Sequence, residues 1–199
     1  MSERKESVIG VTNTGLARRK FIFDTTKATM SATAVALLGG YASLGKAASG
    51  QGPADTQNDV RILTTALSAE REAIAAYQLG ADSGLLEPAV LKVALQFQGH
   101  HEAHAELLAS VINDFGGNAP SGNGNYNFPT DNLQQQRDVL EFAASLERGA
   151  VSAYAGAIPL FTNRDLSKAA ASILADEAMH WAVLRQALGL EPVPGAFLS

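Results

Sequence analysis

Residues 67–77 read LSAEREAIAAY, and residues 144–154 read ASLERGAVSAY. Three chemically distinctive positions match between the two stretches: Glu70 with Glu147, Arg71 with Arg148, and Tyr77 with Tyr154. Self-similarity of this kind indicates a repeated structural unit. The chain therefore contains two copies of one unit, and the nature of that unit decides the fold.

A histidine-bearing segment follows each copy at a matched distance. Residues 101–104 read HEAH, and residues 177–180 read EAMH. The separation between the glutamate and the distal histidine is 34 residues in the first half (70 to 104) and 33 in the second (147 to 180). Each half therefore carries a glutamate segment followed by a histidine segment.

Four segments have the apolar period of amphipathic helices, at about residues 56–80, 88–115, 131–161 and 165–188. Pro88 after Glu87 is a good start for the second helix, and Gly116-Gly117 is a good end. We expect residue 55 or 56 to cap the first helix, and residue 130 or 131 to cap the third. Because strand signals are scarce, an all-α fold is predicted.

The connections predict how the helices are arranged. Short joints at residues 81–86 and 162–164 imply antiparallel neighbours, whereas residues 116–129 (GGNAPSGNGNYNFP) have the composition of a long crossing loop. Two hairpins joined by one long crossover form an antiparallel four-helix bundle, which we assign to residues 51–199. The long middle link disfavours the alternative, an up-and-down bundle with short loops.

Composition excludes several classes of protein. The chain has 199 residues, of which 46% are hydrophobic, and a formal net charge of −5. These values fit one globular domain and argue against a nucleic-acid partner. Because cysteine is absent, disulfide scaffolds, thiol nucleophiles and cysteine-ligated metal sites are excluded.

The first fifty residues have a different character from the rest. Residues 18–22 read RRKFI, an apolar stretch follows at 28–45, and small residues occupy 47–50. This order defines an export signal, and paired arginines resemble a twin-arginine (Tat) leader, although Ala17 and Phe23 depart from its usual pattern. We predict that residues 1–50 are a leader and that the protein is periplasmic or extracellular, with no membrane partner after leader removal. An uncleaved membrane anchor is the alternative.

Carboxylates and imidazoles at these spacings predict a metal site. Glu70 and Glu147 lie mid-helix among apolar residues, where a carboxylate is costly unless it is paired or binds metal. Glu177 and His180 are three residues apart and share one helix face. Glutamates from two helices and Glu-x-x-His from the other two build a cage for two divalent ions. The candidate ligands are Glu70, His101, His104, Glu147, Glu177 and His180.

At these residues the sequence resembles the ferritin-like superfamily over about residues 57–190, in particular bacterial exported members that include desiccation-related proteins. The resemblance implies a pair of iron or manganese ions and oxidase, ferroxidase or peroxide-handling activity in stress protection. One departure is His101, which stands where the family has a glutamate. It removes one negative charge and replaces a potential bridging ligand with a terminal one, so ferroxidase chemistry is in question and zinc becomes an alternative metal.

Two other kinds of protein remain open. One is a ferritin-like fold with a degenerate metal site, acting in structure or stress protection without catalysis. The other is a haem-binding or partner-binding bundle, although no cysteine is present for covalent haem attachment. The sequence assigns no catalytic residue, leaves enzymatic activity open, and is compatible with a homo-oligomer. Tyr77 and Tyr154 are expected to pack in the core with satisfied hydroxyls.

Overall fold

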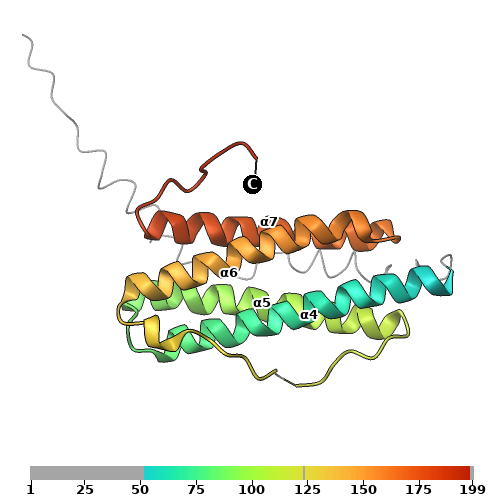
Figure 1. Ribbon diagram of the computed structural model, residues 1–199, viewed down its shortest axis with the longest axis horizontal. Coiled ribbons are helices and arrows are strands. Elements are labelled where there is room, and N and C mark those ends of the chain that lie inside the picture. Colours follow the sequence, from blue (N-terminus) through green and yellow to red (C-terminus); the bar gives the residue numbers. More distant parts are fainter. Residues whose placement is uncertain (1–51, 123, 198–199) are drawn as a thin grey trace, which may run out of the picture. The chain divides into compact units, whose positions relative to one another are not determined.

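Four long helices make up most of the chain that the structure describes (Figure 1). The structure is a computed structural model that describes residues 52–122 and 124–197, so the predicted leader lies outside the described residues. The helices are α4 (Pro53–Asp82), α5 (Pro88–Asp114), α6 (Gln136–Ala157) and α7 (Arg164–Ala187), with short 3-10 turns η2 (Thr130–Asn132) and η3 (Ile158–Leu160). The described residues contain no strand, which confirms the all-α prediction.

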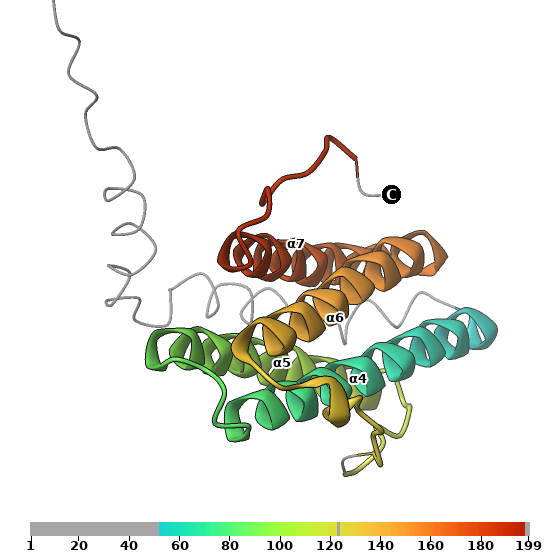
Figure 2. The ribbon, with the colours of Figure 1, turned by 60° about the vertical axis from the view of Figure 1, so that its left-hand side comes forward.

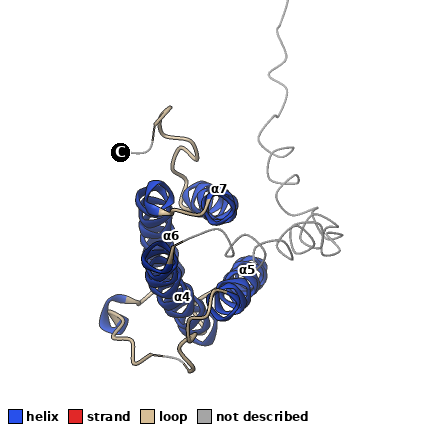
Figure 3. Cartoon of the chain, turned by 90° about the vertical axis from the view of Figure 1, so that its right-hand side faces the viewer, coloured by secondary structure: helices blue, strands red, loops and turns tan. Residues whose placement is uncertain are grey.

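The helices form two hairpins, α4–α5 and α6–α7, which pack together through α4 and α6 (Figures 1 and 3). The crossover between α5 and α6 returns along α4 (Figure 2), where the Arg71 guanidinium donates to the carbonyl of Pro120 at 2.6 Å. The Asp59 carboxylate of α4 accepts the backbone N–H groups of Thr162 (2.8 Å) and Asn163 (3.0 Å) in the second hairpin. The predicted antiparallel bundle with one long crossover is confirmed.

Two helix starts differ from the prediction. The first helix begins at Pro53, ahead of the predicted cap, because proline is well suited to the first turn of a helix. The third begins at Gln136 rather than near residue 131, since Thr130–Asn132 form a separate 3-10 turn. There the Asp138 carboxylate accepts the backbone N–H of Gln135 at 3.0 Å, which stabilises the later start.

Two apolar clusters divide the interior along the helices. The first includes Leu63, Leu67, Leu108, Ile112, Leu166 and Ile173. The second includes Tyr77, Phe97, Leu140, Ala144, Leu184 and Leu188. On every helix the candidate ligands fall between residues of the two clusters, so both ends of the polar layer are sealed from water. None of the described helices has the length and apolarity needed to cross a membrane.

Replacing Leu67 with alanine tests the contribution of the first cluster. Leu67 is fully buried, so Leu67→Ala is expected to lower the free energy of unfolding by about 3 kcal/mol, from lost apolar burial and the cavity left behind. Leu160→Ala is the control, because Leu160 is 62% exposed, and it should change stability by about 0.5 kcal/mol or less. Urea denaturation measures both; equal effects would contradict the assigned core.

Candidate metal centre

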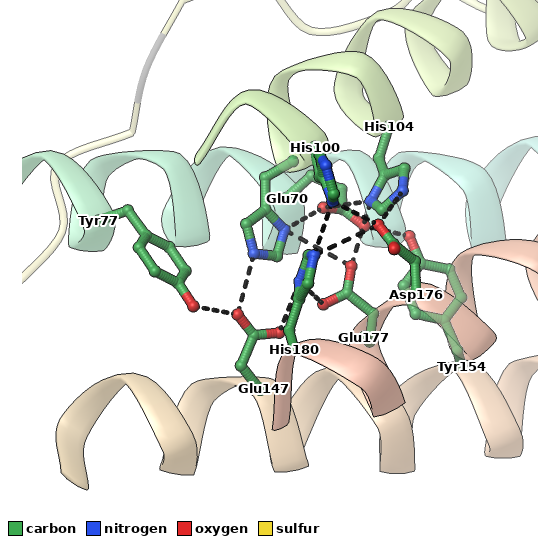
Figure 4. A network of polar contacts seen from close by, with 10 residues as sticks. Glu70, Tyr77, His100, His104, Glu147, Tyr154, Asp176, Glu177 and His180 are labelled. Atoms are coloured by element: carbon green, nitrogen blue, oxygen red, sulfur yellow. Dashed lines mark hydrogen bonds and ion pairs between the residues drawn. The ribbon is translucent and has the colours of Figure 1, made fainter. Parts of the chain in front are cut away.

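All six candidate ligands converge in the layer between the apolar clusters (Figure 4). Glu70 comes from α4, His101 and His104 from α5, Glu147 from α6, and Glu177 and His180 from α7. Five of them are at most 2% exposed, and the side chain of His104 is 14% exposed. The helical period explains this convergence, because each ligand lies on the inward face of its helix.

Glu177 lies at the middle of the layer, with its two oxygens facing different partners. Its Oε1 is 3.1 Å from His104 Nδ1 and 3.5 Å from His101 Nδ1. Its Oε2 is 3.7 Å from His180 Nδ1. The carboxylate therefore stands between two groups of ligand atoms, as a bridging ligand would.

The candidate ligands form two overlapping sets. Within each set the ligand atoms lie within 4.8 Å of one another. One set is Glu70, His101, His104 and Glu177; the other is His101, Glu147, Glu177 and His180. Glu177 and His101 belong to both sets. A shared carboxylate, here that of Glu177, is what two neighbouring cations require of one site.

Buried donor and acceptor atoms without a hydrogen-bond partner show whether these residues fit a metal ion. Among the described residues, the buried side-chain atoms without a hydrogen-bond partner are His104 Nδ1, Glu147 Oε2, both oxygens of Glu177, and His180 Nδ1. They are close together but are not aligned for hydrogen bonding with one another. Burying such atoms without partners costs about 1–3 kcal/mol each, and a cation between them would remove that cost. Oxygen and imidazole nitrogen donors suit iron, manganese or zinc.

His101 spans the layer between two glutamates. Its Nδ1 is 2.8 Å from Glu70 Oε2, and its Nε2 is 3.3 Å from Glu147 Oε1. In the imidazolium form both nitrogens donate, so this ring can hold both carboxylates in the metal-free protein. A neutral imidazole has one lone pair and can ligate one ion.

Charge pairing sets the protonation of the layer. Burial disfavours every charged form here, but hydrogen bonds from His101 and His104 outweigh burial and lower the pKa of Glu70 to about 2. The pKa of Glu147 is likewise well below its ordinary value, through His101 and His180. Burial would lower the pKa values of the histidines, but hydrogen bonds and charge attraction from the glutamates outweigh it. They raise the pKa of His101 to about 10 and those of His104 and His180 to about 9. Burial dominates at Glu177 and raises its pKa.

Each matched tyrosine supports the glutamate of the other repeat. The Tyr154 hydroxyl donates to Glu70 Oε1 at 2.5 Å, and the Tyr77 hydroxyl donates to Glu147 Oε1. Burial first, and the neighbouring carboxylates second, raise the pKa of both phenols. The phenols therefore stay protonated and hold the carboxylates in place, as the prediction of satisfied hydroxyls requires.

Asp176 is a site residue that the sequence reasoning missed. Its Oδ2 is 3.5 Å from His104 Nε2 and 3.4 Å from His180 Nε2. A carboxylate at this position orients both rings so that Nδ1 faces the centre, the usual arrangement of metal-binding histidines. The missed signal was its position four residues before His180 on the same helix face.

A cavity of about 550 Å³ reaches the centre between α4 and α6. Glu70, His101 and Glu147 line it, together with many alanine and glycine residues of the two helices. Small side chains leave this space because their volumes do not fill the gap between the helices. The cavity gives a small molecule a route to three of the candidate ligands.

A family comparison agrees with this geometry. The ferritin-like domain family matches residues 58–190 of the chain. The chain belongs to the ferritin-like family. Among proteins of curated function, none matches this ferritin-like chain.

Two solved structures share the ferritin-like fold. A conserved hypothetical protein, rv2844, from Mycobacterium tuberculosis is 21% identical, with a TM-score of 0.62 and coverage of 72% of this chain and 99% of that chain. The second is a structure of ferritin like, diiron-carboxylate proteins from Bacillus anthracis str. Ames. It is 20% identical, with a TM-score of 0.59, and the match covers 69% of this chain and 99% of the chain in that structure. At these identities the likeness shows the fold.

The histidine protonation states predict opposite pH dependences for stability and metal affinity. The pKa of each of these histidines is higher in the folded metal-free protein than its value of 6.5 in the unfolded chain. Protonation of the ring therefore stabilises the fold, fully at pH values below 6.5, and this stabilisation is lost as the pH rises toward 9–10. Metal ligation needs deprotonated imidazole, so affinity should rise over the same interval, with proton release. Titration calorimetry with Mn(II) in buffers of different ionisation enthalpy measures the protons released. An affinity that does not change between pH 6.5 and 9 would contradict the assigned ligands.

Removing the Asp176 charge should weaken metal binding without unfolding the protein. Asp176→Asn is expected to reduce Mn(II) affinity by about 10–100-fold, because two ligand rings lose their anionic partner. Asp165→Asn is the matched control, since Asp165 is exposed at the start of the same helix. Equilibrium dialysis gives both affinities, and equal values for the two variants would exclude the orienting role.

Proposed function

We propose that this ferritin-like protein binds two iron or manganese ions and uses them to oxidise Fe(II) or to consume peroxide in stress protection. The observation that carries the proposal is the set of five buried ligand atoms without hydrogen-bond partners around Glu177. An apolar site would not place carboxylates and imidazoles there, and a purely structural polar network would align them for hydrogen bonds.

The ligand types support iron or manganese, with zinc as the competing metal. Three carboxylates and three imidazoles provide hard oxygen and borderline nitrogen donors, and the chain has no cysteine sulfur. Bound iron or manganese would supply one-electron redox chemistry, which the side chains alone lack. Tyr77 holds the Glu147 carboxylate and Tyr154 holds the Glu70 carboxylate, and the apolar clusters exclude bulk water.

The cavity between α4 and α6 supports a small diffusible oxidant as the co-substrate. It reaches Glu70, His101 and Glu147, and most of the remaining wall consists of alanine, glycine and leucine or isoleucine residues, with Thr65, Glu72, Ser145 and Tyr154 as its other polar residues. Dioxygen and hydrogen peroxide are small enough to enter, and an apolar lining favours dioxygen in particular.

Export forms part of the same proposal. The RRKFI segment at residues 18–22 and the apolar stretch after it support a twin-arginine leader. Twin-arginine export carries folded cargo, so metal could be inserted inside the cell. This order would protect the site from copper and zinc, which nitrogen and oxygen ligands intrinsically prefer over iron and manganese.

The second candidate function is a structural or stress-protection role without metal. The observation that favours it is the charge pairing of His101 with Glu70 and Glu147, which compensates the buried carboxylates in the metal-free protein. This function predicts a folded protein that binds no metal at either ligand set.

Metal stoichiometry and Fe(II) oxidation test the proposal. Wild-type protein produced with its leader should contain two iron or manganese ions per chain. The Glu177→Gln variant should retain at most one ion, because both ligand sets use this carboxylate. Glu102→Gln, at an exposed position on α5, is the control and should retain two. Elemental analysis and the rate of Fe(II) oxidation are measured on proteins whose circular dichroism is unchanged. A folded wild-type protein without metal would favour the structural role.

A further inference from the structure

A third group of ligand atoms lies on the outer side of the centre, between α5 and α7 (Figure 4). His100 Nδ1 is 2.8 Å from His180 Nε2 and 3.0 Å from Asp176 Oδ2, and Asp176 Oδ2 is 3.4 Å from His180 Nε2. His100 and Asp176 immediately precede His101 and Glu177, so they hold equivalent positions in the two repeats. We call His100, Asp176 and His180 the outer cluster.

His100 Nδ1 and His180 Nε2 are hydrogen-bonded in the metal-free protein, and the atoms of the outer cluster are also close enough together to ligate one cation, which would replace that hydrogen bond. Donors bound at about 2.1 Å are about 3.0 Å apart in octahedral geometry and about 3.4 Å apart in tetrahedral geometry. All three separations in the outer cluster lie close to this interval. Two imidazoles and one carboxylate are also a common ligand set for divalent transition metals.

Two side chains of the outer cluster are more exposed to solvent than those of the centre. The side chain of His100 is 37% exposed and that of Asp176 is 23% exposed, whereas Glu177 is fully buried. Water can therefore complete the coordination of a cation at the outer cluster, and a hydrated ion can reach it without unfolding the bundle.

His180 connects the outer cluster with the centre. Its Nε2 belongs to the outer cluster, while its Nδ1 is 3.4 Å from Glu147 Oε2 and 3.7 Å from Glu177 Oε2. A neutral imidazole carries its lone pair on one nitrogen, so His180 can ligate on one side at a time. This exclusivity favours transfer of an ion from one side to the other over permanent occupation of both.

We propose that the outer cluster captures a divalent cation from solvent and delivers it to the buried centre. The inference rests on the proposed metal-binding function. Asp176 acts first as an outer ligand and, after transfer, as the anionic partner that orients His104 and His180. His100 acts in capture alone, because its polar and ring contacts within the described residues are with His180, Asp176 and Phe97.

Loading kinetics with Co(II), followed by visible absorption in a stopped-flow instrument, test the proposal. His100→Ala should still bind two ions at equilibrium, but its loading rate should fall at least about tenfold. His100→Asp, which places an oxygen near the Nδ1 position, should restore much of the rate. Glu102→Ala removes an exposed carboxylate from the same helix and should load at the wild-type rate.

The outcomes separate this inference from the proposed function. Wild-type loading in His100→Ala, with two ions bound, would overturn the capture role and leave the metal centre intact. Failure of the wild type to bind Co(II) would overturn both. Slow loading that His100→Asp does not rescue would also count against capture, since a ligand role is transferable to another donor.

Discussion

The burial of three carboxylates with three imidazoles in one layer is the constraint on which the rest of the structure depends. None of these groups could stay charged alone between apolar clusters, since an isolated buried charge is far too costly. Each glutamate is therefore within 4 Å of a histidine ring, and the layer as a whole holds the four helices in register. The same groups leave five ligand atoms unsatisfied, so pairing alone does not complete the site.

The internal repeat explains both the symmetry of the centre and its departure from symmetry. Tyr77 supports Glu147, and Tyr154 supports Glu70, so each half of the chain stabilises the ligand of the other half. Glu177 and His101 are repeat equivalents, and both belong to both ligand sets. One is a carboxylate with two oxygens available to metal, whereas the other is a ring that pairs with glutamates. This asymmetry distinguishes the chain from a site with two bridging carboxylates.

The period of the helices was sufficient to predict the bundle and the convergence of the six candidate ligands. A helix face follows from residue spacing alone, so Glu70 and His104 could be placed inward before any contact was known. Asp176 could be placed beside His180 from their spacing on α7, but its contact with His104 depends on the separation between α5 and α7, which spacing within one helix does not give. The start of α6 was missed for a similar reason, since the 3-10 turn and the Asp138 cap are set by local backbone geometry. The leader and the identity of the metal stay predictions.

Anomalous X-ray diffraction from crystals of protein purified with its metal tests the central claim most directly. We expect two cation peaks per chain on either side of the Glu177 carboxylate, one beside Glu70 and His104 and the other beside Glu147 and His180. A structure in which the Glu177 oxygens instead form aligned hydrogen bonds with the histidines, with no anomalous peak between them, would contradict it.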